Sequence, residues 1–105
     1  ILLCSFISPT NEIRKMAKDI VGEDDFLEIF IDTPLEVCES RDPKGLYKKA
    51  RKGEIKNFTG ISSPFEIPEN PFLKVDNTDP DTEKTIKSML LKILPEIKFD
   101  PLRVI

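Results

Sequence analysis

Short runs rich in apolar residues alternate with amphipathic segments along the chain. Residues 1–7 are apolar apart from one serine, and residues 26–31 and 72–75 form two further runs of this kind. Runs of this length and composition are typical of strands buried on both faces of a parallel sheet. The segments between them have helical spacing, and strands that alternate with helices predict an α/β fold with a mostly parallel sheet.

A polar residue close to a proline marks the start of each expected helix. Serine and aspartate side chains cap helix N-termini, and proline fits the first helical turn. We therefore expect Ser8, Asp42 and Asp79 to be N-caps, each followed by proline at the first helical position. Another short helix is expected to begin at residues 32–34 and to run to about Arg41.

Glycines mark the ends of two expected helices. Gly22 is expected to end the first helix, and a glycine at position 53 is expected to end the basic helix that follows Asp42.

Two of the expected helices have an apolar stripe that predicts which face is buried. The residues expected to face inward are Ile13, Met16, Ala17 and Ile20 in the first helix and Ile86, Met89, Leu90 and Ile93 in the last.

The segment at residues 57–72 contains a glycine, three prolines and two serines, so it does not form one regular element. A loop of this length inside a compact domain is usually functional or a linker. We therefore expect a lid at about residues 54–72.

Composition narrows the function classes. The 105 residues carry 16 basic and 19 acidic side chains, a net charge of −3, which argues against a generic nucleic-acid binder. No apolar run approaches the roughly 18 residues that a membrane helix needs, and residues 1–7 lack the basic start and cleavage site of a signal peptide. The chain has no histidine and two cysteines, Cys4 and Cys38, so a zinc site is not expected. The two cysteines are expected to be reduced thiols in the core of a cytoplasmic protein.

Charge is unevenly distributed. Residues 41–56 contain seven basic and two acidic side chains, a local charge of +5, so the other residues sum to −8. The basic segment is either a solvated helix face or a surface that attracts small polyanions such as nucleotides. A basic interaction module unrelated to nucleotides is a third interpretation.

Two further positions have alternative roles. Ser8 follows an expected strand and starts an expected helix, which is where α/β proteins bind anions, but the same residue can be a plain cap. Phe58 lies beside Gly60 in the expected lid. Its ring either belongs to the core or stacks on a base when the loop closes.

Several motifs in a fixed order resemble one family. They lie at residues 6–9 (Phe-Ile-Ser-Pro), 30–35, 38–51 and 56–61, and the run Asp-Pro-Lys-Gly-Leu-Tyr-Lys within 38–51 is the most specific of them. Together with the Pro-Phe-Glu and Pro-Glu that follow, they resemble the adenylyl-sulfate kinase (APS kinase) family of P-loop phosphotransferases. The resemblance covers roughly residues 1–78, and the last helix is compatible with it.

The resemblance implies that ATP, with Mg²⁺, phosphorylates the 3′-hydroxyl of adenosine 5′-phosphosulfate (APS) to give PAPS in sulfate assimilation. It also implies a cytoplasmic homodimer that acts on these small molecules, with no nucleic-acid or membrane partner. The residues implied to contact APS are Ile7, Ser8, Lys44, Asn57 and Phe58, and Arg41 is implied to lie against the ATP base.

Two of these roles leave alternatives open. Ser8 occupies the position assigned in bacterial members as a phosphoserine intermediate, whereas direct in-line transfer needs only an oriented hydroxyl at this place. Arg41 can instead pair with Asp42 or another nearby acid. Arg14 matches a further position of the family pattern.

One family motif does not occur in the 105 residues. The phosphate loop Gly-x-x-x-x-Gly-Lys-Ser/Thr is absent, so no backbone cradle for the ATP phosphates and no hydroxyl for Mg²⁺ are expected. Residues 1–98 are therefore expected to be the carboxyl-terminal part of an APS kinase domain, and residues 99–105 a tail. We expect a partial three-layer P-loop fold and no kinase activity from this chain alone. The alternative is a non-catalytic regulatory domain that binds APS or PAPS.

Overall fold

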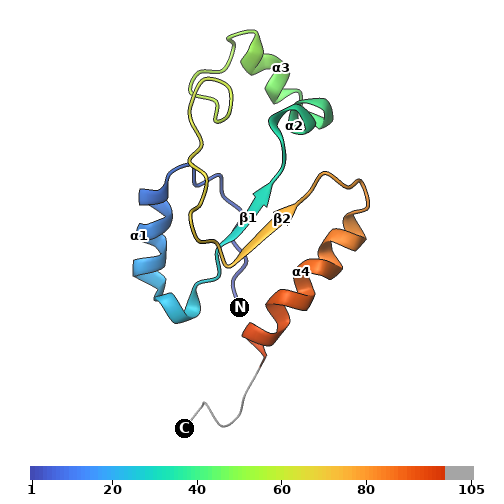
Figure 1. Ribbon diagram of the computed structural model, residues 1–105. Helices are drawn as coiled ribbons and strands as arrows, with labels where there is room; N and C mark the ends of the chain where they lie inside the picture. The colour runs from blue at the N-terminus through green and yellow to red at the C-terminus, as the bar shows by residue number, and fades with distance from the viewer. Residues whose placement is uncertain (99–105) are drawn as a thin grey trace.

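The computed structural model describes residues 1–98, and the expected tail at residues 99–105 lies outside the described residues. Figure 1 shows a short central sheet with helices on either side of it. The elements in chain order are helix α1 (Asn11–Val21), the 3₁₀ turn η1 (Glu23–Asp25), strand β1 (Ile29–Asp32), helices α2 (Leu35–Arg41) and α3 (Leu46–Arg51), strand β2 (Leu73–Asp76) and helix α4 (Thr82–Ile97).

The sheet consists of β1 and β2, which pair in parallel with Ile29 opposite Leu73 and Asp32 opposite Asp76. The chain between the strands forms α2, α3 and the long segment at residues 52–72, which contains no further helix or named strand. The predicted alternation of strands and helices is confirmed for this part of the chain. Both strands end at the same edge, where a ligand site is expected in open α/β sheets.

The prediction of a buried strand at residues 1–7 is wrong for this chain. Within the described residues this segment pairs with no strand, and Ile1, Leu3 and Phe6 are 94%, 90% and 81% exposed. A strand needs a neighbour for its backbone hydrogen bonds and for its two faces. In Figure 1 the segment rises from the first residue to α1 in the same general direction as β1.

Three predicted helix starts are displaced toward the carboxyl end. The N-cap of α1 is Thr10 rather than Ser8, and its hydroxyl accepts a hydrogen bond from the Ile13 amide at 3.2 Å. The N-cap of α4 is Asp81 rather than Asp79. Threonine and aspartate at these two positions provide the cap geometry directly, so the preceding prolines lie outside the helices.

The third displaced start is that of α3, which begins at Leu46 after Gly45 rather than directly after Asp42. Gly45 has the left-handed backbone, φ +67°, which turns the chain before the helix. The predicted helix ends agree better with the structure: Gly22 terminates α1 with φ +101°, and α2 ends at Arg41.

The predicted inward face of α1 is wrong for three of its four residues, since only Ala17 is half-buried. Ile13, Met16 and Ile20 are 43%, 57% and 78% exposed, while Arg14 is the buried residue of the helix. For the last helix the predicted inward face is half right, since Met89 and Ile93 are half-buried but Ile86 and Leu90 are exposed. An apolar stripe is buried only where another element covers it, and α1 has few contacts beyond η1 and the loop at 65–66.

The core is small. Among the described residues its apolar members are Phe30 on β1, Ala50 on α3 and Val75 on β2. The radius of gyration is 16.5 Å, whereas about 13 Å is typical of a compact chain of this length.

Both cysteines are free; Cys38 is half-buried, but Cys4 is exposed, so the prediction that both are core thiols is wrong for Cys4. No helix within residues 1–98 is both long and apolar enough to cross a membrane.

Candidate functional site

Ser8 and Asn57 share an unusual backbone conformation. Their φ angles are +43° and +54°, which lie in the left-handed range that residues with a Cβ rarely adopt. Such conformations are uncommon for residues with a side chain and cluster at functional sites. Both residues are predicted contacts of the substrate.

The turn at Ser8 is held by the side chain of Arg14. One terminal nitrogen of its guanidinium donates a hydrogen bond to the Ser8 carbonyl. The other donates to the Asn11 Oδ1 at 2.6 Å and to the carbonyl of Glu66 at 2.5 Å. The Glu66 amide in turn donates to the carbonyl of Pro9 at 2.8 Å. The start of α1 is therefore fastened to the second half of the long loop.

Aromatic contacts strengthen this junction. The Arg14 guanidinium lies over the ring of Phe65, 5.4 Å from its centroid, and Phe65 stacks on Phe30 of β1 with centroids 6.0 Å apart. An arginine over an aromatic face gains a cation–π contribution. The loop is thereby connected through Phe65 to the sheet.

Lys44 lies in the turn between α2 and α3, and the side chain of Asp42 shapes that turn. The two carboxylate oxygens of Asp42 accept hydrogen bonds from the backbone amides of Tyr47 at 3.0 Å and Lys48 at 3.1 Å. Asp42 thus satisfies free donors in the first turn of α3 although it lies four residues before the helix. Lys44 is exposed within this fixed turn, so its ammonium group is accessible to an anion.

Phe58 packs against α3. Its ring contacts Tyr47 edge-on, with centroids 5.0 Å apart and an interplanar angle of 72°. The backbone around it forms a tight turn in which its carbonyl accepts hydrogen bonds from the amides of residues 61–63 and its amide donates to the Ser62 hydroxyl. Partial burial, and secondarily the neighbouring Cys38, raise the pKa of Tyr47.

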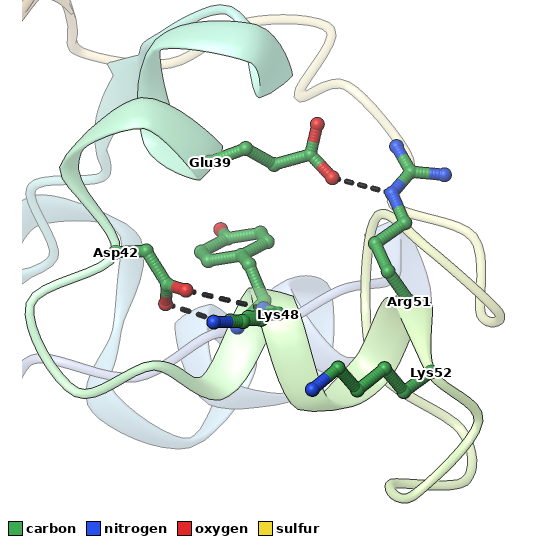
Figure 2. Close-up of a pocket in the computed structure, with 6 residues that line it drawn as sticks. Glu39, Asp42, Lys48, Arg51 and Lys52 are labelled. Carbon is green, nitrogen blue, oxygen red and sulfur yellow. Dashed lines mark hydrogen bonds and ion pairs between the residues drawn. The ribbon is translucent and has the colours of Figure 1, made fainter.

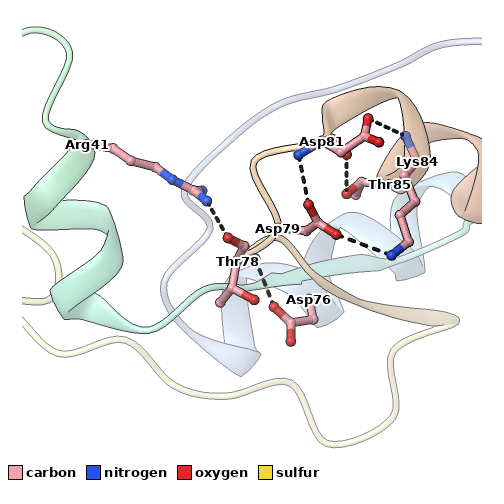
Figure 3. A network of polar contacts seen from close by, with 7 residues as sticks. All are labelled: Arg41, Asp76, Thr78, Asp79, Asp81, Lys84 and Thr85. Atoms are coloured by element: carbon pink, nitrogen blue, oxygen red, sulfur yellow. Dashed lines mark hydrogen bonds and ion pairs between the residues drawn. The ribbon is translucent and has the colours of Figure 1, made fainter.

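Arg41, at the end of α2, bonds to the loop that follows β2. Its guanidinium donates to the carbonyl of Thr78 at 3.0 Å, as Figure 3 shows, and no ion pair joins Arg41 to Asp42 in the described residues. The carboxylates of the same loop are held by local donors: Thr78 lowers the pKa of Asp76, and the Asp81 amide, followed by Lys84, lowers that of Asp79. This network fixes the loop at the carboxyl edge of the sheet.

A shallow pocket of about 440 Å³ lies beside α3 (Figure 2). An ion pair between Arg51 and Glu39 at 2.5 Å spans it. Its lining residues are Glu39, Asp42, Tyr47, Lys48, Arg51 and Lys52. None of the predicted substrate contacts lines this pocket, so it does not define the candidate site.

The predicted site residues form two groups in the structure. Ser8 is joined to the loop through Arg14 and Glu66, whereas Phe58 is joined to the turn bearing Lys44 through Tyr47. Within residues 1–98 no hydrogen bond or ion pair links one group directly to the other. The loop at residues 57–72 runs through both, with Asn57 and Phe58 at one end and Phe65 and Glu66 further along.

Two structural members of the site were not predicted as such. Arg14 was noted only as a match to the family pattern, and its burial has no signal in the spacing of α1, where the apolar residues lie on other faces. Tyr47 belongs to the most specific motif, but only the folded loop shows that it contacts Phe58.

The described residues contain no group of three or more His, Cys, Asp or Glu side chains that could hold a metal ion.

Comparison with known proteins identifies relatives. Residues 1–76 match the family model described as adenylylsulphate kinase. An adenylyl-sulfate kinase of Bacteroides thetaiotaomicron is 57% identical over 98 residues, which are 93% of this chain and 49% of that protein. One from Bacteroides fragilis is 58% identical over 97 residues, covering 92% of this chain and 48% of that protein. The chain spans about half the length of these curated relatives.

A solved structure has the same fold. The APS kinase CysC of Mycobacterium tuberculosis, in complex with AMPPNP and APS, matches with a TM-score of 0.72 and 46% identity. The match covers 82% of this chain and 51% of that chain. Together with the parallel pairing of β1 and β2, it confirms the predicted class, an α/β fold of the P-loop NTPase type that is present here as a partial domain.

Proposed function

Since this chain belongs to the adenylylsulphate kinase family, we propose that its residues are the substrate-side part of an enzyme that phosphorylates APS. The enzyme transfers the γ-phosphate of ATP to the 3′-hydroxyl of APS and releases PAPS and ADP. Mg²⁺ enters with ATP as part of the substrate. The chain contributes the APS contacts, and Arg41 lies against the ATP base.

The observation that carries the proposal is the backbone of Ser8 and Asn57. Strained backbone persists where surrounding contacts maintain it, and here it coincides with two predicted APS contacts. The proposal for the other residues rests on charge and shape. Lys44 offers an exposed cation to the phosphosulfate, and Phe58 offers a half-buried ring for stacking on adenine.

We assign Ser8 the role of a substrate contact rather than a nucleophile. A nucleophilic serine needs an adjacent base to accept its proton. Among residues 1–98 the Ser8 hydroxyl has no hydrogen bond to a carboxylate, and the contact that holds this residue uses its carbonyl instead. Phosphoryl transfer depends mainly on positioning and charge stabilisation, which an oriented hydroxyl can support. Intact-mass measurement after incubation with ATP tests the phosphoserine alternative.

The cytoplasmic location and the homodimer stay part of this proposal. The two free cysteines support a reducing compartment. The dimer rests on the family alone, and its test is the oligomeric state of the complete enzyme.

Activity is testable in a chimera. The residues of the B. thetaiotaomicron relative that precede the matched region are joined to this chain, and ADP release is followed with ATP and APS. We expect APS-dependent turnover from the chimera and none from the 105 residues alone, because their sequence has no phosphate-loop motif. Turnover by the chain alone would contradict the second expectation.

A matched pair of lysine variants locates the APS contact. Lys44→Ala in the chimera is expected to lower kcat/KM for APS by about 10-fold or more, the effect of losing one charged hydrogen bond. Lys52→Ala, which removes an exposed lysine of the same basic segment, is expected to stay within about 2-fold. Equal effects of the two variants would reject a specific role for Lys44. A chimera that binds APS without transferring phosphate would instead favour the regulatory alternative.

A further inference from the structure

Arg14 differs from every other charged residue in the described part of the chain. It is 8% exposed and is the only charged side chain there that is buried. Burying a guanidinium is costly unless its donors are satisfied. Its position inside the junction between α1 and the loop therefore needs a structural reason.

The hydrogen bonds of Arg14 connect segments that are distant in sequence. Its two terminal nitrogens reach the carbonyl of Ser8 and the carbonyl of Glu66, which is 52 residues further along the chain. The planar guanidinium presents its donors in a fixed fork, so it holds both carbonyls in one relative position. A lysine at this place has one flexible ammonium group and cannot reproduce that geometry.

Among the described residues no carboxylate pairs directly with Arg14; that of Glu66 accepts a hydrogen bond from the neighbouring Asn11 amide at 3.4 Å. The three acceptors of Arg14 are two backbone carbonyls and the side-chain amide of Asn11, all of them uncharged. None of the ion pairs among residues 1–98 includes Arg14, and its Nε is buried without a partner. A positive charge without a directly paired carboxylate therefore lies against the Ser8 carbonyl, where it also favours an anionic ligand.

We propose that Arg14 is the positioning residue of the APS site, which holds Ser8 in its left-handed conformation and anchors the second half of the 57–72 loop to it. The identity of the ligand, APS, rests on the proposed function, whereas the role of Arg14 in holding Ser8 and the loop rests on the hydrogen bonds alone. The first half of the loop has a separate anchor, the contact of Phe58 with Tyr47. Arg14 thus sets where the far end of the loop lies while the Phe58 end engages the substrate.

The test uses the full 105-residue chain and two readouts. Arg14→Lys keeps the charge and removes the fork, and Arg14→Met removes both. Arg51→Lys, at an exposed arginine paired with Glu39, is the matched control. Hydrogen exchange is measured at the Glu66 amide, which bonds to Pro9, and at the Leu73 amide, which bonds to Glu28 outside the junction. APS binding is measured by titration.

Both Arg14 variants are expected to raise the exchange rate at Glu66 by about 10-fold or more and to leave Leu73 within about 2-fold, because charged hydrogen bonds are strong and local. Arg14→Lys is expected to weaken APS binding about 10-fold, Arg14→Met more, and Arg51→Lys less than 2-fold. Unchanged exchange at Glu66, or equal acceleration at Glu66 and Leu73, overturns the proposal. If the unmodified chain binds no APS, the assignment of the ligand fails, and the exchange rates still decide whether Arg14 holds the junction.

Discussion

At the scale of single residues, the site depends on backbone conformations that side chains normally avoid. Ser8 is held by Arg14, and Asn57 begins the loop that carries Phe58. Asparagine tolerates the left-handed region better than most residues, whereas a β-branched side chain there is a clear outlier. Backbone strain and side-chain chemistry can therefore be separated at Asn57.

Two substitutions at Asn57 are expected to differ in their effect on the free energy of unfolding but to weaken APS binding alike. Asn57→Val is expected to lower the free energy of unfolding by about 1–2 kcal/mol, the cost of a left-handed residue with a branched side chain. Asn57→Gly is expected to stay within about 0.5 kcal/mol, because glycine adopts positive φ without strain. Both remove the amide and are expected to weaken APS binding. Urea unfolding and APS titration measure the two effects, and equal stability of the two variants would contradict the strain argument.

At the scale of elements, the turns between helices place the site residues. The helices begin where a side chain supplies the missing acceptors: Thr10 for α1, Asp42 for α3 and Asp81 for α4. The polar-proline pairs that precede them are part of the turns instead. The loop also approaches α2 closely, since Gly60 lies next to the side chain of Leu35.

Two glycines provide a matched test of that contact. Gly60 has φ +91°, and a Cβ there would lie 3.3 Å from the Leu35 Cδ1, whereas Gly53 has φ +76° with nothing within 4 Å. Gly53→Ala is expected to cost about 1 kcal/mol of unfolding free energy from the backbone alone. Gly60→Ala is expected to cost about 2 kcal/mol, because Leu35 must also shift. Thermal or urea unfolding measures both, and the opposite order would reject the contact.

At the scale of the whole molecule, the chain leaves much apolar surface uncovered. Leu2, Leu3 and Phe6 are at least 81% exposed, and the two-stranded sheet has both edges unpaired within the described residues. Large apolar patches and open sheet edges promote association.

The purified chain is therefore expected to self-associate as its concentration rises. Leu3→Lys is expected to reduce this association, because it places a charge in the exposed apolar segment. Asn70→Lys adds a positive charge at an exposed loop position and is expected to leave association unchanged. Sedimentation velocity over a concentration series measures the effect. A concentration-independent monomer, or equal effects of the two lysines, would contradict this expectation.

Features that depend on residues close together in the chain could be predicted from the sequence alone. The apolar runs predicted β1 and β2 to within a few residues, Gly22 predicted the end of α1, and the ordered motifs indicated the family. The polar-proline pairs predicted helix starts that lie two or three residues before the observed ones. These features follow from short-range preferences and from local chemistry that is visible in the chain. The roles of Ile7, Ser8, Lys44, Asn57, Phe58 and Arg41 in substrate binding stay predictions.

What each of these elements packs against depends on the folded chain and could not be read from its own pattern. An apolar run becomes a strand when another strand lies beside it, and within residues 1–98 the segment at 1–7 has no such neighbour. Likewise, the stripe on α1 is exposed while Arg14 is buried, because the loop at residues 65–66 packs on the arginine's side of the helix. Burial and hydrogen-bond pairing are properties of two surfaces, and the pattern along one segment specifies only one of them.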